Sequence, residues 1–321
     1  MKIKELIKSV PFMKAIGKKY YIYSQFRDDA KSFSKYYCES AENKGDYRYS
    51  IMLIVHSLEK GMCMQNPRPF GKDKASKLLE LLKKSKNKKS FEYNLGISAL
   101  NKWVDFYKER NWDIDSLVET CSRFLEDENI TLDAGYKMYT PSVFADQKEF
   151  EYIIMSRHSV RDFKKQKLSD EDIDFAVKCF IETPTACNRQ MCRLIFVEDK
   201  DKKDFLDKVI VGLPGFNKNN IQYFVVTYDL AAFAYSGERQ QGMFNAGLCT
   251  MNFVNGLHVK GIGSCCLQWS NKKNEDIQTR KKLGLKESER IAVVIAAGYY
   301  LDKNIIPCST RKSKNEVYIK V

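Results

Sequence analysis

The sequence predicts an α+β fold in which a mostly helical N-terminal region precedes a mixed sheet flanked by helices. Two observations lead to this prediction. Apolar residues recur at helical spacing through the first 110 residues, whereas short runs rich in β-branched and aromatic residues alternate with helical stretches after residue 150. The 321 residues, of which 44% are hydrophobic, suffice for two domains with apolar cores.

Three helices are expected in the N-terminal region, around residues 51–58, 78–82 and 97–107, because apolar side chains share one face in each segment. The turn Pro67-Arg68-Pro69-Phe70-Gly71 separates the first two, since it cannot continue a helix.

The stretch from residue 113 to residue 146 is acidic and is interpreted as a loop. We therefore predict a helical region over residues 1–145 and a second domain over residues 146–321.

In the second domain, Ser169 is predicted to cap a helix, with Asp172 as its capping-box partner. Buried strands are expected at residues 194–197, 223–228 and 291–297. A long helix is expected from Ser236 to about His258 and is apolar on more than one side, so it should be buried either in the core of its own subunit or against a partner. If a partner covers it, a charge at Val254, or at Phe253 if that side faces the partner, should break the contact; if it is the core of one subunit, the same changes should unfold the chain.

The net charge of +13 is spread evenly, at +6 over residues 1–150 (27 Lys and Arg, 21 Asp and Glu) and +7 over residues 151–321 (27 and 20). A nucleic-acid footprint is normally concentrated on one element, so no nucleic-acid partner is expected. No apolar run approaches the roughly 20 residues that span a bilayer, and the lysine-interrupted N-terminus is unlike a secretory signal. We therefore expect a cytoplasmic protein without a membrane span.

The ten cysteines include no CxxC pair, and the three histidines fall in no Cys/His cluster with the spacing of metal ligands. Reduced thiols and no metal site are expected.

Arg157 and Arg161 lie four residues apart with Ser159 between them. Arginine forms forked, charge-assisted bonds, and the three side chains can surround a phosphate dianion. An exposed basic turn next to a helix explains the same residues equally well.

A second segment, Pro184-Thr185-Ala186-Cys187-Asn188-Arg189-Gln190, precedes a predicted strand. Its Asn188 and Gln190 side chains each offer a donor and an acceptor, which suit the polar edge of a flavin ring or its ribityl hydroxyls. By itself, this segment is better explained as a polar loop.

A third segment, Gly261-Ile262-Gly263-Ser264-Cys265-Cys266, follows the long helix, and its two glycines allow the backbone to lie flat against a planar ligand. It lacks the third glycine and the preceding strand of a dinucleotide fingerprint. Near the C-terminus, Arg311 provides a further cation.

Taken in order, these segments resemble the nitroreductase family over about residues 152–317. The family patterns are R-x-S-x-R-x-F, P-S/T-x-x-N-x-Q, G-L/I-G and a strand that ends in glycine before a basic residue. They are matched by Arg157, Ser159, Arg161 and Phe163; by Pro184, Thr185, Asn188 and Gln190; by Gly261-Ile262-Gly263; and by Gly298 and Arg311.

The resemblance implies an α+β homodimer with two FMN molecules in its interface. Arg157, His158, Ser159 and Arg311 would hold the phosphate, assisted by Arg161. Asn188 and Gln190, in the loop that begins with Pro184 and Thr185, would face the ribityl chain or the ring. Gly263, Ser264 and Cys265 would lie near the reactive edge of the flavin.

The implied activity is transfer of hydride from NADH or NADPH through the flavin to a small organic acceptor. No catalytic side chain is expected, and Cys187, Cys265 and Cys266 are interpreted as small buried hydrophobes. Two alternatives stay open: a flavin oxidase or dehydrogenase that acts on a biosynthetic intermediate without nicotinamide, and a non-catalytic dimeric scaffold. The arginines and the Asn188/Gln190 pair argue against the scaffold.

The N-terminal region lies outside this resemblance. Its segment from His56 to Met62, followed by residues 67–71, resembles the leader of a nitroreductase subgroup associated with surface-polysaccharide gene clusters.

Overall fold

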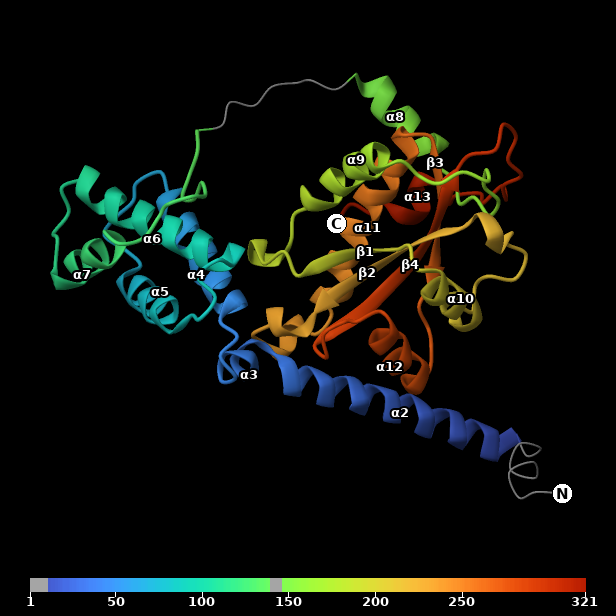
Figure 1. The fold of residues 1–321 in the computed structure, drawn as a ribbon, viewed down its shortest axis with the longest axis horizontal. Helices are drawn as coiled ribbons and strands as arrows, with labels where there is room; N and C mark the ends of the chain where they lie inside the picture. Colours follow the sequence, from blue (N-terminus) through green and yellow to red (C-terminus); the bar gives the residue numbers. More distant parts are fainter. Residues whose placement is uncertain (1–10, 139–145) are drawn as a thin grey trace.

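The computed structural model describes residues 11–138 and 146–321. The N-terminal part is helical, as predicted, and its helices are drawn in blue to green in Figure 1. They are α2 (Pro11–Tyr36), α3 (Cys38–Glu42), α4 (Arg48–Met62), α5 (Lys72–Lys84), α6 (Phe91–Glu109) and α7 (Ser116–Leu125). The prediction of a loop over residues 113–146 is thus partly wrong, because residues 116–125 form α7. Asp115 caps this helix by accepting hydrogen bonds from the Leu117 and Val118 amides. Residues 139–145 lie outside the described residues, and the domain division at residue 145 stays a prediction.

The turn between α4 and α5 is held by α6. The carbonyl of Phe70 accepts hydrogen bonds from Trp103 Nε1 (3.1 Å) and the Tyr107 hydroxyl (2.8 Å). A Cβ atom at Gly61 would lie 2.1 Å from the Phe70 ring, so glycine is required for the ring to pack on α4. Much of the segment from His56 to Gly71 is therefore explained by packing.

The C-terminal part contains a four-stranded sheet in the order β1-β2-β4-β3. The strands are β1 (Cys192–Val197), β2 (Gln222–Asp229), β3 (Ile262–Gln268) and β4 (Glu289–Tyr299). All three strand pairs are antiparallel, so the expected mixed sheet is wrong, apart from one isolated parallel bridge between Ser159 and Ser264. The three predicted strands lie within β1, β2 and β4. The segment from Gly261 to Cys266 lies almost entirely within strand β3, which was not among the predicted strands.

Helices cover both faces of this sheet (Figure 1). Helices α9 and α11 pack on one face through Ala176, Phe180 and Phe253, and α10 packs on the other through Leu206. The helices of this part are α8 (Gln147–Ser156), α9 (Asp170–Ile181), α10 (Lys200–Val209), α11 (Gln241–Val259), α12 (Lys273–Lys282) and α13 (Lys314–Val317), with 3₁₀ turns η1 (Ala186–Asn188), η2 (Lys218–Asn220), η3 (Leu230–Ala232) and η4 (Ser236–Glu238).

Ser169 caps α9, as predicted, by accepting from the Asp172 amide at 3.2 Å. The Asp172 carboxylate accepts from the Ser169 hydroxyl (2.8 Å) rather than from its backbone, so the reciprocal capping box is not formed.

The long helix α11 begins at Gln241, later than expected, because residues 236–238 form a separate 3₁₀ turn. Phe253 and Val254 are 0% and 1% exposed and lie in the core of their own subunit, so placing them on a subunit interface was wrong. The exposed apolar side chains of α11 are instead Met243, Phe244, Leu248, Met251 and Val259.

The two parts of the chain share one apolar core. Met191, Leu230, Ala231, Ala232 and Phe233 belong to the same buried cluster as the helices α4, α5 and α6. The Cys38 amide also donates to the Phe233 carbonyl at 2.8 Å. The helical region is therefore fixed against Met191, which precedes β1, and against the η3 turn and Phe233, which follow β2.

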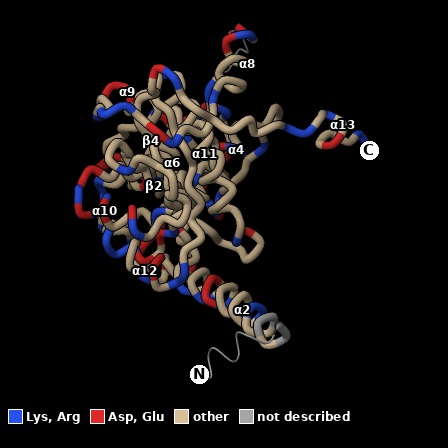
Figure 2. Tube along the Cα trace, turned by 90° about the vertical axis from the view of Figure 1, so that its right-hand side faces the viewer, with Lys and Arg blue, Asp and Glu red and all other residues tan. Residues whose placement is uncertain are grey.

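Both charge signs are interspersed around α10 and α12 (Figure 2). In the described ranges, no helix is apolar over the length that a bilayer crossing needs. Within the same ranges, no group of three or more His, Cys, Asp and Glu side chains is arranged to hold a metal ion.

Candidate functional site

The segment that contains Arg157, His158 and Ser159 runs beside the start of β3. The Val160 amide donates to the Ser264 carbonyl at 3.0 Å, and Ser159 forms the parallel bridge to Ser264. Val160 and Phe163 are buried, whereas Arg157, His158 and Ser159 are half-buried and Arg161 is exposed. The buried apolar residues thus anchor the segment and leave its polar side chains accessible.

His258, from α11, joins this segment to the end of β4. Its Nε2 atom lies 2.8 Å from Ser156 Oγ, and its Nδ1 atom lies 2.9 Å from the Tyr300 hydroxyl. Burial lowers the pKa of His258, and the positive charges of Arg157 and His158 lower it further. Arg157, His158 and His258, here called the Arg157 cluster, therefore lie close together; Arg157 supplies the positive charge that favours an anion, and the charged form of His258 is disfavoured.

Strand β3 forms the floor beneath this cluster. A Cβ atom at Gly263 would lie 2.9 Å from the Tyr300 ring and 3.3 Å from Val160 Cβ, so the glycine allows the segments to approach closely. Ser264 and Cys265 are buried. Burial raises the pKa of the Cys265 thiol, although Arg161 and Ser159 oppose it, so the thiol is protonated at neutral pH and a poor nucleophile.

The loop from Pro184 to Gln190 has an uncommon backbone. Cys187, Asn188 and Gln190 have positive φ angles of 53°, 49° and 49°. Such angles are uncommon outside glycine and persist only where the surroundings enforce them, often at ligand sites. The Asn188 and Gln190 side chains are exposed, whereas the Thr185 hydroxyl is used internally, accepting from the Gln190 amide at 2.9 Å.

Arg189 enforces this loop conformation, and the sequence analysis assigned it no role. It is 1% exposed; its Nε donates to the Ala186 carbonyl at 2.9 Å, and its guanidinium binds Glu238 and the Ala232 carbonyl. Asn245 adds a second support, accepting from the Ala186 amide at 2.8 Å. The only sequence signal for this role was an arginine within a predicted ligand loop.

The structure places the two groups of predicted site residues at opposite ends of the sheet. Ser264, which pairs with Ser159, lies opposite Ala297 of β4. The loop leads into Cys192, which lies opposite Tyr228 of β2, and Tyr228 lies opposite Arg290 of β4. Ala297 and Arg290 are seven residues apart on β4, or roughly 23 Å at about 3.3 Å per residue. Within one chain, the Arg157 cluster and the Asn188/Gln190 loop are not brought together.

Arg311 lies on the exposed C-terminal arm that leads to α13, which projects from the body in Figure 2. Its guanidinium donates to the Ser309 carbonyl. Among the described residues it makes no ion pair or hydrogen bond with the Arg157 segment.

No curated protein sequence matches this chain. Similar solved structures include an FMN-dependent nitroreductase from Clostridium difficile R20291 (20% identity; 53% of this chain and 98% of that chain covered; TM-score 0.45). Another, from Desulfovibrio desulfuricans, is described as a nitroreductase in complex with FMN (21% identity; 53% and 95% covered; TM-score 0.46). A nitroreductase family protein from Streptococcus pneumoniae TIGR4 is 20% identical (54% and 100% covered; TM-score 0.45).

The comparison with protein families matches one segment. Residues 154–299 match the Nitroreductase family, and this range includes the Arg157 segment, the Pro184–Gln190 loop and all four strands. Residues 154–299 of this chain therefore form a nitroreductase-family domain.

Proposed function

We propose that this protein is an FMN-dependent oxidoreductase that works as a cytoplasmic homodimer and transfers hydride from NADH or NADPH to a small organic acceptor. The observation that carries the proposal is the half-buried basic segment with Arg157 and His158 beside β3, held in place by His258 and lying within the nitroreductase-family domain.

The residues fit an FMN phosphate. Arg157 supplies a half-buried guanidinium, Ser159 a hydroxyl, and His158 a further donor, and Arg161 extends the positive field toward solvent. A compact cluster of this kind suits one phosphate group, which favours FMN over FAD. Gly263, Ser264 and Cys265 offer a flat strand surface to the ring. Arg311 is proposed as a further phosphate ligand, which requires its arm to move or to come from the second subunit.

A bound flavin would supply the hydride chemistry. The protein's own contribution would be to bind and orient. Arg157 would hold the phosphate end, His258 would keep the segment in place through Ser156 and Tyr300, and the strained loop would present Asn188 and Gln190 in fixed directions. The protonated Cys265 thiol would only pack.

The separation within one chain supports a dimer. One FMN molecule cannot span the roughly 23 Å along β4 that separates the Arg157 cluster from the loop, so a complete site would combine the cluster of one subunit with the loop of the other. The exposed apolar side chains of α11 offer a surface for this contact, since Phe244 is 62% exposed and Met251 is 46% exposed.

Substitution of the exposed face tests the dimer. Leu248→Asp should give a folded monomer that has lost its flavin, whereas Phe253→Asp, in the subunit core, should unfold the chain. Light scattering with an absorbance trace separates these outcomes. A native monomer of Leu248→Asp that retains flavin would contradict the shared site.

Anaerobic addition of NADH or NADPH to the purified yellow protein tests the activity. Loss of the flavin absorbance near its long-wavelength maximum, followed by its return on addition of a quinone or nitroaromatic acceptor, is the expected result. A flavin that neither nicotinamide reduces would favour the alternative of an oxidase or dehydrogenase acting on a biosynthetic intermediate. A colourless protein that binds no added FMN would favour the non-catalytic scaffold.

A further inference from the structure

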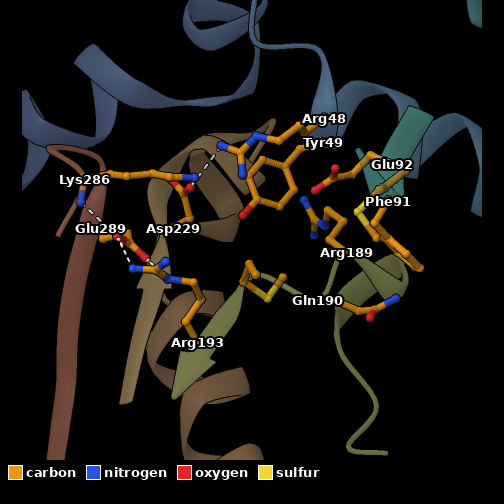
Figure 3. A pocket seen from close by; sticks show the side chains of 12 residues that line it. Arg48, Tyr49, Phe91, Glu92, Arg189, Gln190, Arg193, Asp229, Lys286 and Glu289 are labelled. Atoms are coloured by element: carbon orange, nitrogen blue, oxygen red, sulfur yellow. Dashed lines mark hydrogen bonds and ion pairs between the residues drawn. The ribbon is translucent and has the colours of Figure 1, made fainter. Parts of the chain in front are cut away.

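A charged cavity lies where the helical region meets the sheet, at the opposite end of β4 from the Arg157 cluster. Its volume is about 190 Å³, which corresponds to about six water molecules at roughly 30 Å³ each. Helices α4 and α6 form one side, and the ends of β1, β2 and β4 form the other (Figure 3). Neither part of the chain makes the cavity alone.

Most of the charges in its wall neutralise one another. Arg193 pairs with Glu289, which is buried, and Arg48 binds Asp46 at 2.8 Å and Asp229 at 3.4 Å. The guanidinium of Arg189 is saturated by Glu238 and backbone carbonyls. These groups define the walls and are not free to hold a ligand of high net charge.

Four polar groups in the wall are left over. Within the described part of the chain, the Glu92 carboxylate and the Lys286 ammonium group form no ion pair, and the Tyr49 hydroxyl and the exposed Gln190 side-chain amide have no hydrogen-bond partner. Tyr49 is only 7% exposed, and Figure 3 shows its hydroxyl directed into the cavity. The hydroxyl is not among the fully buried unpaired atoms, so it is open to the cavity and available to an occupant.

The two unpaired charges have opposite signs and lie on opposite sides of the cavity in Figure 3, with Tyr49 between them. Met52, Met191 and Phe91 add apolar surface. Phe91 and Lys286 are exposed, which gives a ligand access from solvent.

We propose that this cavity binds a small zwitterion, with one ammonium and one carboxylate group, of the size of a free amino acid. Its ammonium group would pair with Glu92 and its carboxylate with Lys286, and the Tyr49 hydroxyl would bond to the ligand between them. A phosphate dianion is disfavoured by the carboxylates of Glu92, Asp229 and Glu289, and a dication by the arginines. The cavity is separate from the proposed phosphate cluster, but Gln190 also lines it, so it adjoins the loop that is proposed to face the flavin.

Isothermal titration calorimetry on the full-length protein tests the proposal, with the twenty L-amino acids added one at a time. At least one should bind with a stoichiometry of one per chain. Its decarboxylated amine and its deaminated acid should each bind at least about tenfold more weakly, because each loses one charge-assisted contact.

Glu92→Gln, Lys286→Met and Tyr49→Phe should each weaken binding, the first two by at least about tenfold. Glu119→Gln and Lys282→Met, which remove charges outside the cavity wall, are the matched controls and should leave binding unchanged. Failure of every amino acid to bind would overturn the proposal, as would binding that the three cavity variants leave intact. Flavin content, followed by absorbance in the same samples, separates this result from failure of the proposed FMN site.

Discussion

Replacing Arg189 by Met should destabilise the protein severely, because the arginine is the buried clamp of the Pro184–Gln190 loop. Its side chain is 0% exposed and its partner Glu238 is 20% exposed. Burial raises the pKa of Glu238, but Arg189 and the backbone amide of Ala234 outweigh it and hold the pKa below its usual value. Removing Arg189 takes away the main group that lowers this pKa and leaves the part-buried carboxylate without its cationic partner.

Breaking a buried ion pair by removing one partner costs about 3–5 kcal/mol. The carbonyls of Ala186 and Ala232 would also lose their donors, although such costs are not additive. Because a typical domain is stable by about 5–15 kcal/mol, Arg189→Met should remain folded only marginally. Arg189→Lys retains the positive charge but not the planar guanidinium that binds several acceptors at once, so it should lose less stability than Arg189→Met.

Urea denaturation measures both losses. The control is Arg239→Met, since Arg239 is exposed and makes a single 3.4 Å contact, and it should change stability by no more than about 0.5 kcal/mol. Equal stability of Arg189→Met and Arg239→Met would refute the clamp. Arg189→Lys should also bind FMN more weakly if the clamp positions the loop, and unchanged FMN affinity would refute that part of the reasoning.

Three further outcomes are expected. Arg157→Ala should weaken FMN binding by about one to two orders of magnitude while leaving the melting temperature of the apoprotein unchanged, as measured by flavin titration, because it removes a charge-assisted bond of about 1.5–3 kcal/mol; unchanged affinity would contradict the phosphate site. Gly298→Ala should cost about 1–3 kcal/mol in urea denaturation, because its Cβ would lie 2.6 Å from Phe163 Cβ, whereas Gly237→Ala, with no atom within 4 Å, should not destabilise. Burial, Arg157 and His158 lower the pKa of His258, so the unfolded chain binds a proton more readily and stability should fall as pH drops below about 6.5. Replacing His258 by Gln should reduce the fall in melting temperature at low pH. His56→Gln is the comparison, because burial also lowers the pKa of His56. An unaltered pH profile of the melting temperature in His258→Gln would show that His258 does not cause the fall.

Local patterns in the sequence were sufficient for much of the fold. The helices α4, α5 and α6, the Ser169 cap and the strands β1, β2 and β4 follow from apolar periodicity and capping chemistry, which act within a few residues. Strand β3 was missed because glycine, serine and cysteine carry little β-propensity; pairing with β4 defines it.

The tertiary features could not be predicted in the same way. The direction of the strands and the burial of Phe253 and Val254 depend on how distant segments pack, and the apolar pattern of α11 did not reveal which side faces its own core. The role of Arg189 depends on Glu238, 49 residues away, and the cavity requires both parts of the chain. The family patterns placed Arg157, Asn188 and Gln190 in one site, whereas the structure shows that one chain alone holds them apart.

Mass spectrometry of the small molecules released on denaturing the purified protein tests the central claim most directly. The amount of released flavin is divided by the protein concentration. The proposed function predicts about one FMN molecule per chain in the native protein and little FMN in Arg157→Ala. Release of FAD, or of no flavin from a native protein that also fails to take up added FMN, would contradict it.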